Sequence, residues 1–203
     1  MKARELAVPG AWEFTPEVHR DSRGAFVAHY TESEFARVTG RRLRLGQNHH
    51  SISRRGAVRG VHYADVPPGQ AKVVCCTAGE LLDVVVDLRV GSPTFGRWDS
   101  VVLDAHSYRA VYLEEGLGHA FIALRDGTVA AYLNSAEYNP SAEHEIDPFD
   151  PQLGLPWPSD VEYLVSDRDR GAPTLAEAER AGLLPSYEAC RALNAGRRGP
   201  SGA

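Results

Sequence analysis

Residues 58–74, VRGVHYADVPPGQAKVV, carry three side chains that could do chemistry within a strand-like run. A strand of a soluble sheet normally shows bland polar groups on its exposed face, whereas Arg59, His62 and Lys72 are cationic or can become so. The Pro-Pro-Gly sequence at 67–69 is typical of a turn. We predict a hairpin that closes there and brings His62 and Lys72 onto one surface.

His62 is a candidate general base if a carboxylate lies beside it, because an isolated histidine is more often structural. The segment SDRDRGAPTL, residues 166–175, is predicted to be a loop that offers Asp167 and Asp169 for this purpose. A carboxylate there would fix the tautomer of the imidazole and stabilise its protonated form. Lys72 would supply a positive charge for an oxyanion.

Tyrosines and arginines complete the set of candidate residues. Tyr132 and Tyr138 offer phenolic protons, although tyrosines on strands commonly serve packing. Arg23, Arg59 and Arg168 carry the guanidinium fork that suits a diphosphate. For each arginine alone, a solvated surface position is an equally good interpretation.

A metal site is a weaker interpretation of the histidines. His49 and His50 are neighbours in GQNHHSIS, residues 46–53, and on a strand they would face opposite ways. The His119 segment adds no second histidine at H-x-H or H-x-x-x-H spacing, which would place two imidazoles on one face. We therefore expect no metal.

Composition excludes several function classes. At 203 residues, with 43% hydrophobic and 24% charged residues, the chain suits one soluble domain. A net charge of −5 argues against a nucleic-acid partner held by bulk electrostatics. No apolar run has the length of a membrane span. Three cysteines make no disulfide framework, so we expect reduced thiols and a cytoplasmic location.

The order of elements predicts an antiparallel sandwich or barrel. Apolar, strand-like runs separated by turn residues lie at 72–90, 95–104, 108–124 and 127–138. Helix signals are confined to the flanks, at 31–40 and 174–184, each with a threonine N-cap and a glutamate three residues later. We expect a single domain over 1–193 and a disordered tail at 194–203.

Several separated motifs resemble one family in order and spacing. They include RDSRGAF, GAVRGVHY, PPGQAKVV, VYLEEGLGHAF and VSDRDRGAPTL, and the match extends over about residues 1–190. The chain resembles the dTDP-4-dehydrorhamnose 3,5-epimerases. This resemblance implies a mainly β, cupin-type jelly-roll barrel with short flanking helices, a homodimer that shares strands, a nucleotide-sugar substrate, and no metal or other cofactor.

The resemblance also implies roles for individual residues. By motif position, His62 is the base supported by Asp169, Tyr132 is the acid on the other face of the sugar, and Lys72 stabilises the enolate. Tyr138 is the rival acid. The positions that match contacts to the substrate are Arg23, Gln47, Arg59, Lys72, His119, Tyr138, Glu143 and Arg168. The implied reaction is cofactor-independent epimerisation at C3, C5 or both carbons of a dTDP-4-keto-6-deoxyhexose.

The chain also departs from the family's motifs. Ala28 stands where a glutamate is expected, Ala64 replaces the glutamine of His-Tyr-Gln, and His49 replaces the asparagine of Gln-Asp-Asn. These departures resemble epimerases of antibiotic deoxysugar pathways. Two alternatives remain: a metal-dependent cupin isomerase or oxygenase, and a nucleotide-sugar-binding protein without chemistry.

Overall fold

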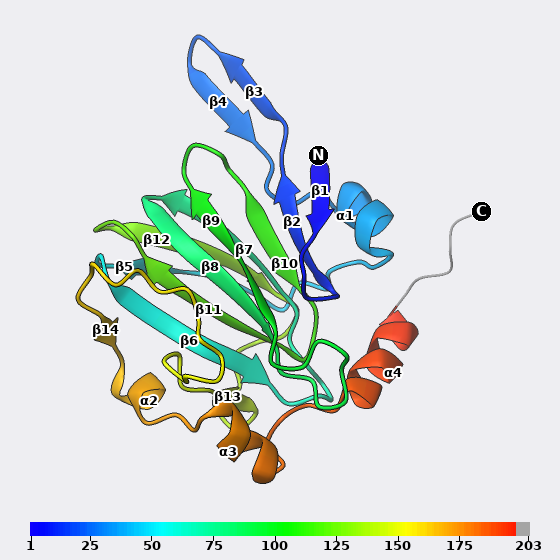
Figure 1. The fold of residues 1–203 in the computed structure, drawn as a ribbon. Coiled ribbons are helices and arrows are strands. Elements are labelled where there is room, and N and C mark those ends of the chain that lie inside the picture. The colour runs from blue at the N-terminus through cyan, green and yellow to red at the C-terminus, as the bar shows by residue number, and fades with distance from the viewer. Residues whose placement is uncertain (198–203) are drawn as a thin grey trace.

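Two antiparallel sheets face each other in the computed structural model, which describes residues 1–197 (Figure 1). Sheet I has the strand order β1-β2-β10-β7-β12-β5, and sheet II has the order β13-β6-β11-β8-β9, with β14 parallel to β6. The strands of sheet I are Lys2–Glu5 (β1), Ala11–Thr15 (β2), Gln47–Ser53 (β5), Lys72–Ala78 (β7), Ala110–Leu113 (β10) and Thr128–Asn134 (β12). The strands of sheet II are Ala57–Ala64 (β6), Glu80–Asp87 (β8), Trp98–Asp104 (β9), Leu117–Ala123 (β11), Glu143–Glu145 (β13) and Leu164–Val165 (β14).

The arrangement confirms the predicted jelly-roll barrel. Side chains of both sheets meet in an apolar interior that includes Val74, Leu103 and Phe121. The strands show why the sequence folds this way: every second residue of β12 is buried, whereas β11 is buried throughout. A strand in the middle of sheet II is covered on both faces and is therefore almost wholly apolar.

Within residues 1–197, four helices flank the sheets: Glu32–Thr39 (α1), Asp167–Arg170 (α2), Leu175–Arg180 (α3) and Tyr187–Arg197 (α4). The helix predicted at 31–40 is confirmed, and Gly40 ends it in the left-handed conformation at φ +69°. The helix predicted at 174–184 begins with the expected capping box of Thr174 and Glu177 but ends four residues early.

Three predictions about local structure are wrong. The Pro-Pro-Gly segment does not close a hairpin, because β6 pairs with β11 and β13 while β7 pairs with β10 and β12. The chain crosses there from sheet II to sheet I. The segment with Asp167 and Asp169 is the short helix α2. Residues 194–197 belong to α4, and residues 198–203 of the predicted disordered tail lie outside the described residues.

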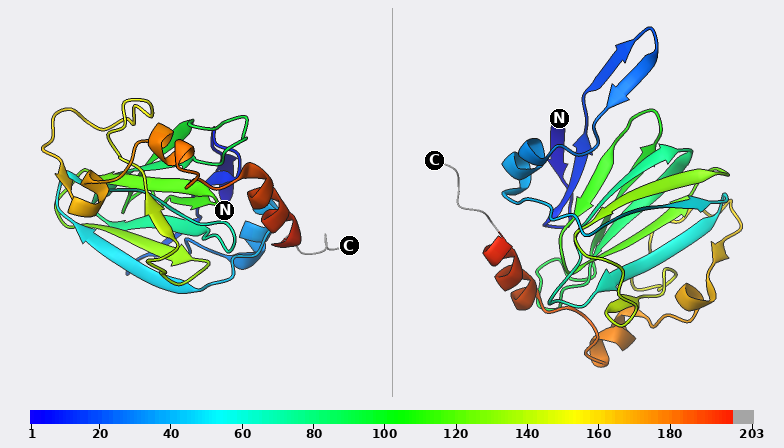
Figure 2. Two further views of the ribbon diagram at one scale, coloured as in Figure 1. Left: turned by 90° about the horizontal axis from the view of Figure 1, so that it is seen from below. Right: turned by 180° about the vertical axis from the view of Figure 1, so that it is seen from behind.

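A separate hairpin projects beyond the barrel. It consists of Val18–Asp21 (β3) and Gly24–Val27 (β4), which pair with each other and with no strand of sheet I or sheet II. Figure 1 and the right-hand view of Figure 2 show it extending away from the sheets. Phe26 on this hairpin is 70% exposed.

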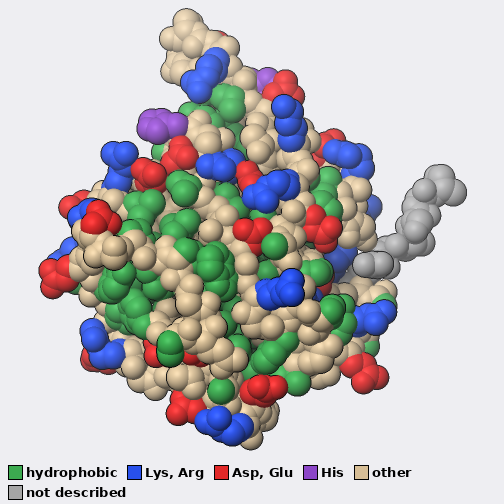
Figure 3. Space-filling view, in the orientation of Figure 1, with side chains coloured by type: hydrophobic (Ala, Val, Ile, Leu, Met, Phe, Trp, Pro, Cys, Tyr) green, Lys and Arg blue, Asp and Glu red, His purple; other side chains and the backbone are tan. Residues whose placement is uncertain are grey.

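The surface carries charges of both signs. On the face drawn in Figure 3, basic and acidic side chains are interspersed, and hydrophobic side chains gather between them. Within residues 1–197, no helix is long and apolar enough to cross a membrane.

Candidate active site

A cavity of about 340 Å³ lies between the two sheets and is lined largely by polar side chains. It brings together most of the residues singled out from the sequence. The lining residues are Gln47, His49, Ser51, Arg59, His62, Gln70, Lys72, His119, Phe121, Tyr132, Asn134, Tyr138 and Glu143. Of the predicted site residues, Asp169, Arg168 and Arg23 do not line it.

Strand alternation explains which side chains of sheet I point into the cavity. Gln47, His49 and Ser51 are alternate residues of β5, so their side chains point the same way. Tyr132 lies directly across from His49 in the register of β12 with β5. The same rule confirms that His50 faces away from His49. Among residues 1–197, no three His, Cys, Asp or Glu side chains gather closely enough to hold a metal ion.

A bulge in β6 places Arg59 and His62 on one face although they are three residues apart. The partner of His62 on β11 is His119 and the partner of Arg59 is Phe121, so two residues of β6 stand opposite one. Gly60 makes the bulge possible, since its φ is +109° and a Cβ there would collide with the His119 carbonyl oxygen. The bulge therefore turns both side chains into the cavity.

His62 and Asp169 form a close pair. The distance from His62 Nε2 to Asp169 Oδ1 is 2.6 Å, and the Asp169 side chain is 4% exposed. Burial alone would raise the pKa of Asp169, but the hydrogen bond and electrostatic attraction of His62, together with hydrogen bonds from Ser166 and the Gly60 backbone, outweigh burial and hold the pKa below its ordinary value. An ionised carboxylate only accepts, so Nε2 carries the ring proton and Nδ1 is the free basic atom.

Lys72 is a buried cation in the same cavity, 8% exposed. Burial lowers the pKa of its ammonium group, while the carboxylates of Glu143 and Asp83 oppose that shift. An ammonium group in such a place lacks much of its solvation. An anion that forms beside it is therefore stabilised far more than it would be in water.

Tyr132 lies on the sheet opposite His62. Burial raises the pKa of its phenol, so the group is protonated at neutral pH. The ring is stacked on His49 and meets His119 edge-on. His119 is itself anchored by Asp83, with 2.7 Å between Nε2 and Oδ2. The arrangement places an imidazole on one side of the cavity and a protonated phenol on the other.

Tyr138 and Arg168 lie at the mouth of the cavity. β12 ends at Asn134, so Tyr138 does not continue its face, and its ring is half exposed. The guanidinium group of Arg168 donates to the Tyr138 hydroxyl at 3.1 Å and pairs with Glu145 at 2.6 Å. Arg168 also lines a neighbouring groove of about 620 Å³, which shares Arg59 and His62 with the cavity.

Arg23 is not part of this cavity. It lies in the turn between β3 and β4, its side chain is 89% exposed, and it pairs with Asp21 on the same hairpin. Ala28, where the resemblance led us to expect a glutamate, follows β4 directly. Arg23 lines neither the cavity nor the neighbouring groove of its own chain.

Several cavity residues were missed from the sequence, among them His49, Gln70 and Asn134, and so was Asp83, which anchors His119. The amide of Gln70 joins Glu143 and Asn134 at 3.2 Å each. Alternation along the strand could have identified Asn134, because a residue two positions from Tyr132 on β12 points to the same face. The sequence singles out His49 only as a possible metal ligand and as a departure from a family motif. Asp83 lies among apolar neighbours in β8, and its role depends on its contact with His119, which the local sequence does not show.

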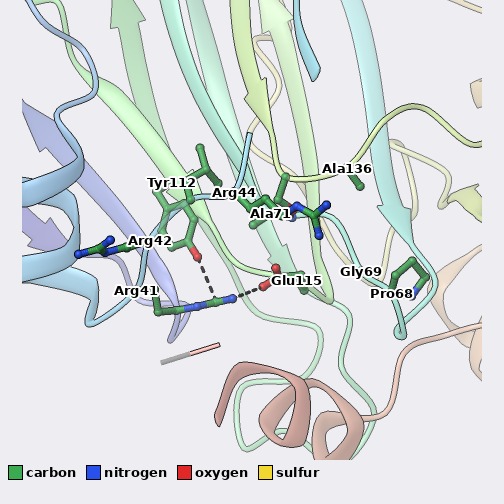
Figure 4. Close-up of a pocket in the computed structure, with 11 residues that line it drawn as sticks. Arg41, Arg42, Arg44, Pro68, Gly69, Ala71, Tyr112, Glu115 and Ala136 are labelled. Atoms are coloured by element: carbon green, nitrogen blue, oxygen red, sulfur yellow. Dashed lines mark hydrogen bonds and ion pairs between the residues drawn. The ribbon is translucent and has the colours of Figure 1, made fainter. Parts of the chain in front are cut away.

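Another cavity, of about 530 Å³, lies on the other face of sheet I, beside the chain that follows α1 (Figure 4). Arg41 points into it, and its guanidinium group donates to the Tyr112 hydroxyl at 3.1 Å and pairs with Glu115 at 2.7 Å. Its charge is thus already compensated by a buried carboxylate. We assign the chemistry to the cavity between the sheets.

Comparison with known proteins gives consistent matches over nearly the whole chain. The family described as dTDP-4-dehydrorhamnose 3,5-epimerase matches residues 5–177. A dTDP-4-dehydrorhamnose 3,5-epimerase of Mycolicibacterium smegmatis is 51% identical over 95% of each chain. A dTDP-4-dehydrorhamnose 3-epimerase of Streptomyces niveus is 52% identical over 95% of this chain and 93% of its own. The crystal structure of ChmJ, a 3'-monoepimerase from Streptomyces bikiniensis in complex with dTDP-quinovose, has a TM-score of 0.93 and 48% identity, covering 96% of this chain and 98% of its own.

Proposed function

Because the chain belongs to the dTDP-4-dehydrorhamnose 3,5-epimerase family, we propose that it inverts C3, C5 or both carbons of a dTDP-4-keto-6-deoxyhexose. It is an isomerase, and the metal-dependent and non-catalytic alternatives are not favoured. The observation that carries the mechanism is the placement of His62, paired with Asp169, on sheet II and of Tyr132 on sheet I.

The first step is proton abstraction next to the ketone. His62 Nδ1 takes the proton from C3 or C5, and the C–H electron pair moves through C4 to the ketone oxygen. The resulting enolate oxygen is stabilised by the Lys72 ammonium group. Asp169 stabilises the imidazolium that forms. The substrate's own ketone accepts the electron pair, so the step needs no cofactor.

The second step is protonation on the opposite face. The Tyr132 hydroxyl donates its proton to the carbon, which inverts the centre and leaves a phenolate. The site resets when the proton on His62 reaches the Tyr132 oxygen through solvent. The atoms and charges then balance over one turnover. A base and an acid on separate sheets explain inversion, because a single residue would return the proton to the face it left.

The nucleotide is proposed to occupy the groove beside the cavity. Arg59 and His62 border both spaces, so a single ligand can place its sugar in one and its diphosphate in the other. Arg59 and Arg168 are suited to the diphosphate oxygens. The diphosphate would compete with Glu145 for Arg168, because the two are paired at 2.6 Å without ligand.

The test is proton NMR of the keto sugar nucleotide with enzyme in deuterium oxide. We expect loss of the C3–H signal, the C5–H signal or both, with one deuteron in each inverted centre. Relatives include both 3,5-epimerases and a 3-epimerase, so both carbons are followed. If the enzyme is folded and binds the nucleotide but produces no exchange and no inversion, the proposal is overturned.

We further propose that the chain is a homodimer in which the β3–β4 hairpin completes the partner's site. The hairpin leaves its own barrel and carries Arg23 and the exposed Phe26. Deleting residues 1–28 would also remove β2, whose Phe14 is buried, so point variants are the better test. A cytoplasmic location is proposed on the three buried cysteines, which are free.

Complementation tests the shared site. Arg23→Ala and His62→Ala should each be inactive as homodimers, whereas coexpression should yield mixed dimers with one intact site and recover activity. Light scattering should give the mass of two chains. A monomer in solution, or coexpressed chains that stay inactive although mixed dimers form, would show that each chain has its own complete site.

A further inference from the structure

His49 and Tyr132 form an aromatic pair inside the cavity. They are directly opposite each other in the register of β5 and β12, and their rings lie parallel within 4° at a centroid distance of 4.7 Å. Directly opposed residues on one face of a sheet have Cβ atoms close enough for such a stack. The geometry therefore follows from the strand register and from an imidazole at position 49.

The stacking contact uses the face of the His49 ring and leaves the nitrogen atoms on its edge available for hydrogen bonds. Nδ1 is buried and has no hydrogen-bond partner among the described residues. Burial and the nearby Lys72 ammonium group lower the pKa of His49, so the imidazole is neutral. A purely structural buried histidine normally satisfies such a nitrogen within the protein. Here the unpartnered atom belongs to a residue that lines the cavity.

The stack fixes the plane of the Tyr132 ring. His49 covers one face of the phenol, and His119 meets the ring at 83° with centroids 5.8 Å apart. The ring of Tyr132 cannot tilt without losing contact with one of them. Its hydroxyl must lie over the carbon on the face opposite His62, and a misplacement of about 1 Å can reduce a rate by about 100-fold.

A direct proton relay from His49 to Tyr132 does not fit this geometry. The N–H bond and the nitrogen lone pair of an imidazole lie in its ring plane. Because the two planes are parallel, neither nitrogen is directed at the phenol stacked above it. The contact between the rings is therefore one of packing.

We propose that His49 is a positioning residue, which holds the Tyr132 ring for protonation and presents Nδ1 to a polar group of the bound sugar. The inference rests on the proposed epimerase function and adds to it a residue that sets how often abstraction leads to inversion. Without the stack, His62 still removes and returns a proton, but fewer enolates are protonated from the far side.

Two substitutions separate the roles of the ring and of its nitrogen. His49→Ala removes both, so the ratio of inversion to deuterium exchange should fall about two- to tenfold, the range that an aromatic pair contributes. His49→Phe keeps the stack and removes Nδ1. Its ratio should match that of the unmodified enzyme, while KM rises about two- to tenfold for one lost hydrogen bond.

The matched control is His50→Ala, since the neighbouring histidine points out of the cavity. Proton NMR in deuterium oxide gives exchange and inversion together, and thermal denaturation shows that each variant folds. An unchanged ratio in His49→Ala, or an equal fall in His49→Phe, overturns the positioning role. An unchanged KM in His49→Phe overturns the assignment of Nδ1. Absence of exchange in the unmodified enzyme would instead reject the epimerase function itself.

Discussion

Replacing Asp169 with asparagine should slow proton abstraction and inversion together. The carboxylate lies 2.6 Å from His62 Nε2 and its side chain is only 4% exposed, so solvent screens the pair weakly. When His62 takes the substrate proton, Asp169 stabilises the new imidazolium. Asparagine has nearly the same size but no charge.

The magnitude follows from the lost charge. A hydrogen bond to a charged group contributes about 1.5–3 kcal/mol, so Asp169→Asn should reduce the rate of deuterium exchange about 10- to 150-fold. An asparagine amide that donates to Nε2 would also move the ring proton to Nδ1 and occupy the basic atom, which makes this range a lower bound.

The assay is the initial rate of deuterium incorporation into the keto sugar, followed by proton NMR, with inversion measured in the same spectra. Asp65→Asn is the matched control, because Asp65 forms a similar pair with His144 at 2.8 Å outside the cavity. It should leave both rates unchanged. A folded Asp169→Asn enzyme that exchanges protons at the normal rate would refute the role of this carboxylate.

Three further predictions concern the acid, the enolate and the fold. Tyr132→Phe should retain deuterium exchange and lose most inversion in the same NMR assay; full inversion would assign the acid elsewhere. Lys72→Ala should lower kcat about 100- to 1,000-fold with a much smaller change in KM, whereas Arg59→Ala should chiefly raise the calorimetric Kd for the nucleotide; a Lys72→Ala enzyme with normal kcat contradicts this. Burial opposes ionisation of Asp87, but hydrogen bonds from Arg89, Ser92 and Thr94 hold the pKa of this carboxyl group below its ordinary value of 3.8. The ionised carboxylate therefore stabilises the fold above pH 3.8, and this stabilisation is lost as the pH falls through the lower pKa of the folded state. Arg89→Met leaves this buried carboxylate unpaired and should cost about 3–5 kcal/mol in denaturant unfolding at pH 7; a loss under 1 kcal/mol would show that the pair is not important for stability.

The sequence predicted the strands well where periodicity and turn residues agree. The run at 72–90 divides at Gly79 into β7 and β8, as its pattern indicated. The error at 67–69 has a physical cause. Turn residues show that the chain changes direction, but not whether the next strand joins the same sheet or the opposite one. His62 and Lys72 do line one cavity, although they do so from opposite sheets.

The site was predictable where a residue type carried its own chemistry, as with His62, Lys72 and Tyr132. It was not predictable where the environment gives a residue its role. Asp83 matters because His119 lies beside it, and that contact depends on a register between strands that no local pattern specifies. Regular alternation would have assigned Arg59 and His62 to opposite faces, and the bulge in β6 that brings them onto one face has no signal in the local pattern.

The division of the proposed acid and base between two sheets has a mechanical consequence. In the described part of the chain no strand of sheet I pairs with a strand of sheet II, so the gap proposed to hold the sugar ring is set by interior side chains such as Leu103 and Phe121. Facing sheets lie about 10 Å apart, and a packed interior is barely compressible. The apolar core therefore acts as a spacer with a narrow tolerance. Substitution of one of these side chains by a smaller one would alter the width of the gap. Catalysis would then change at temperatures where the barrel is still fully folded.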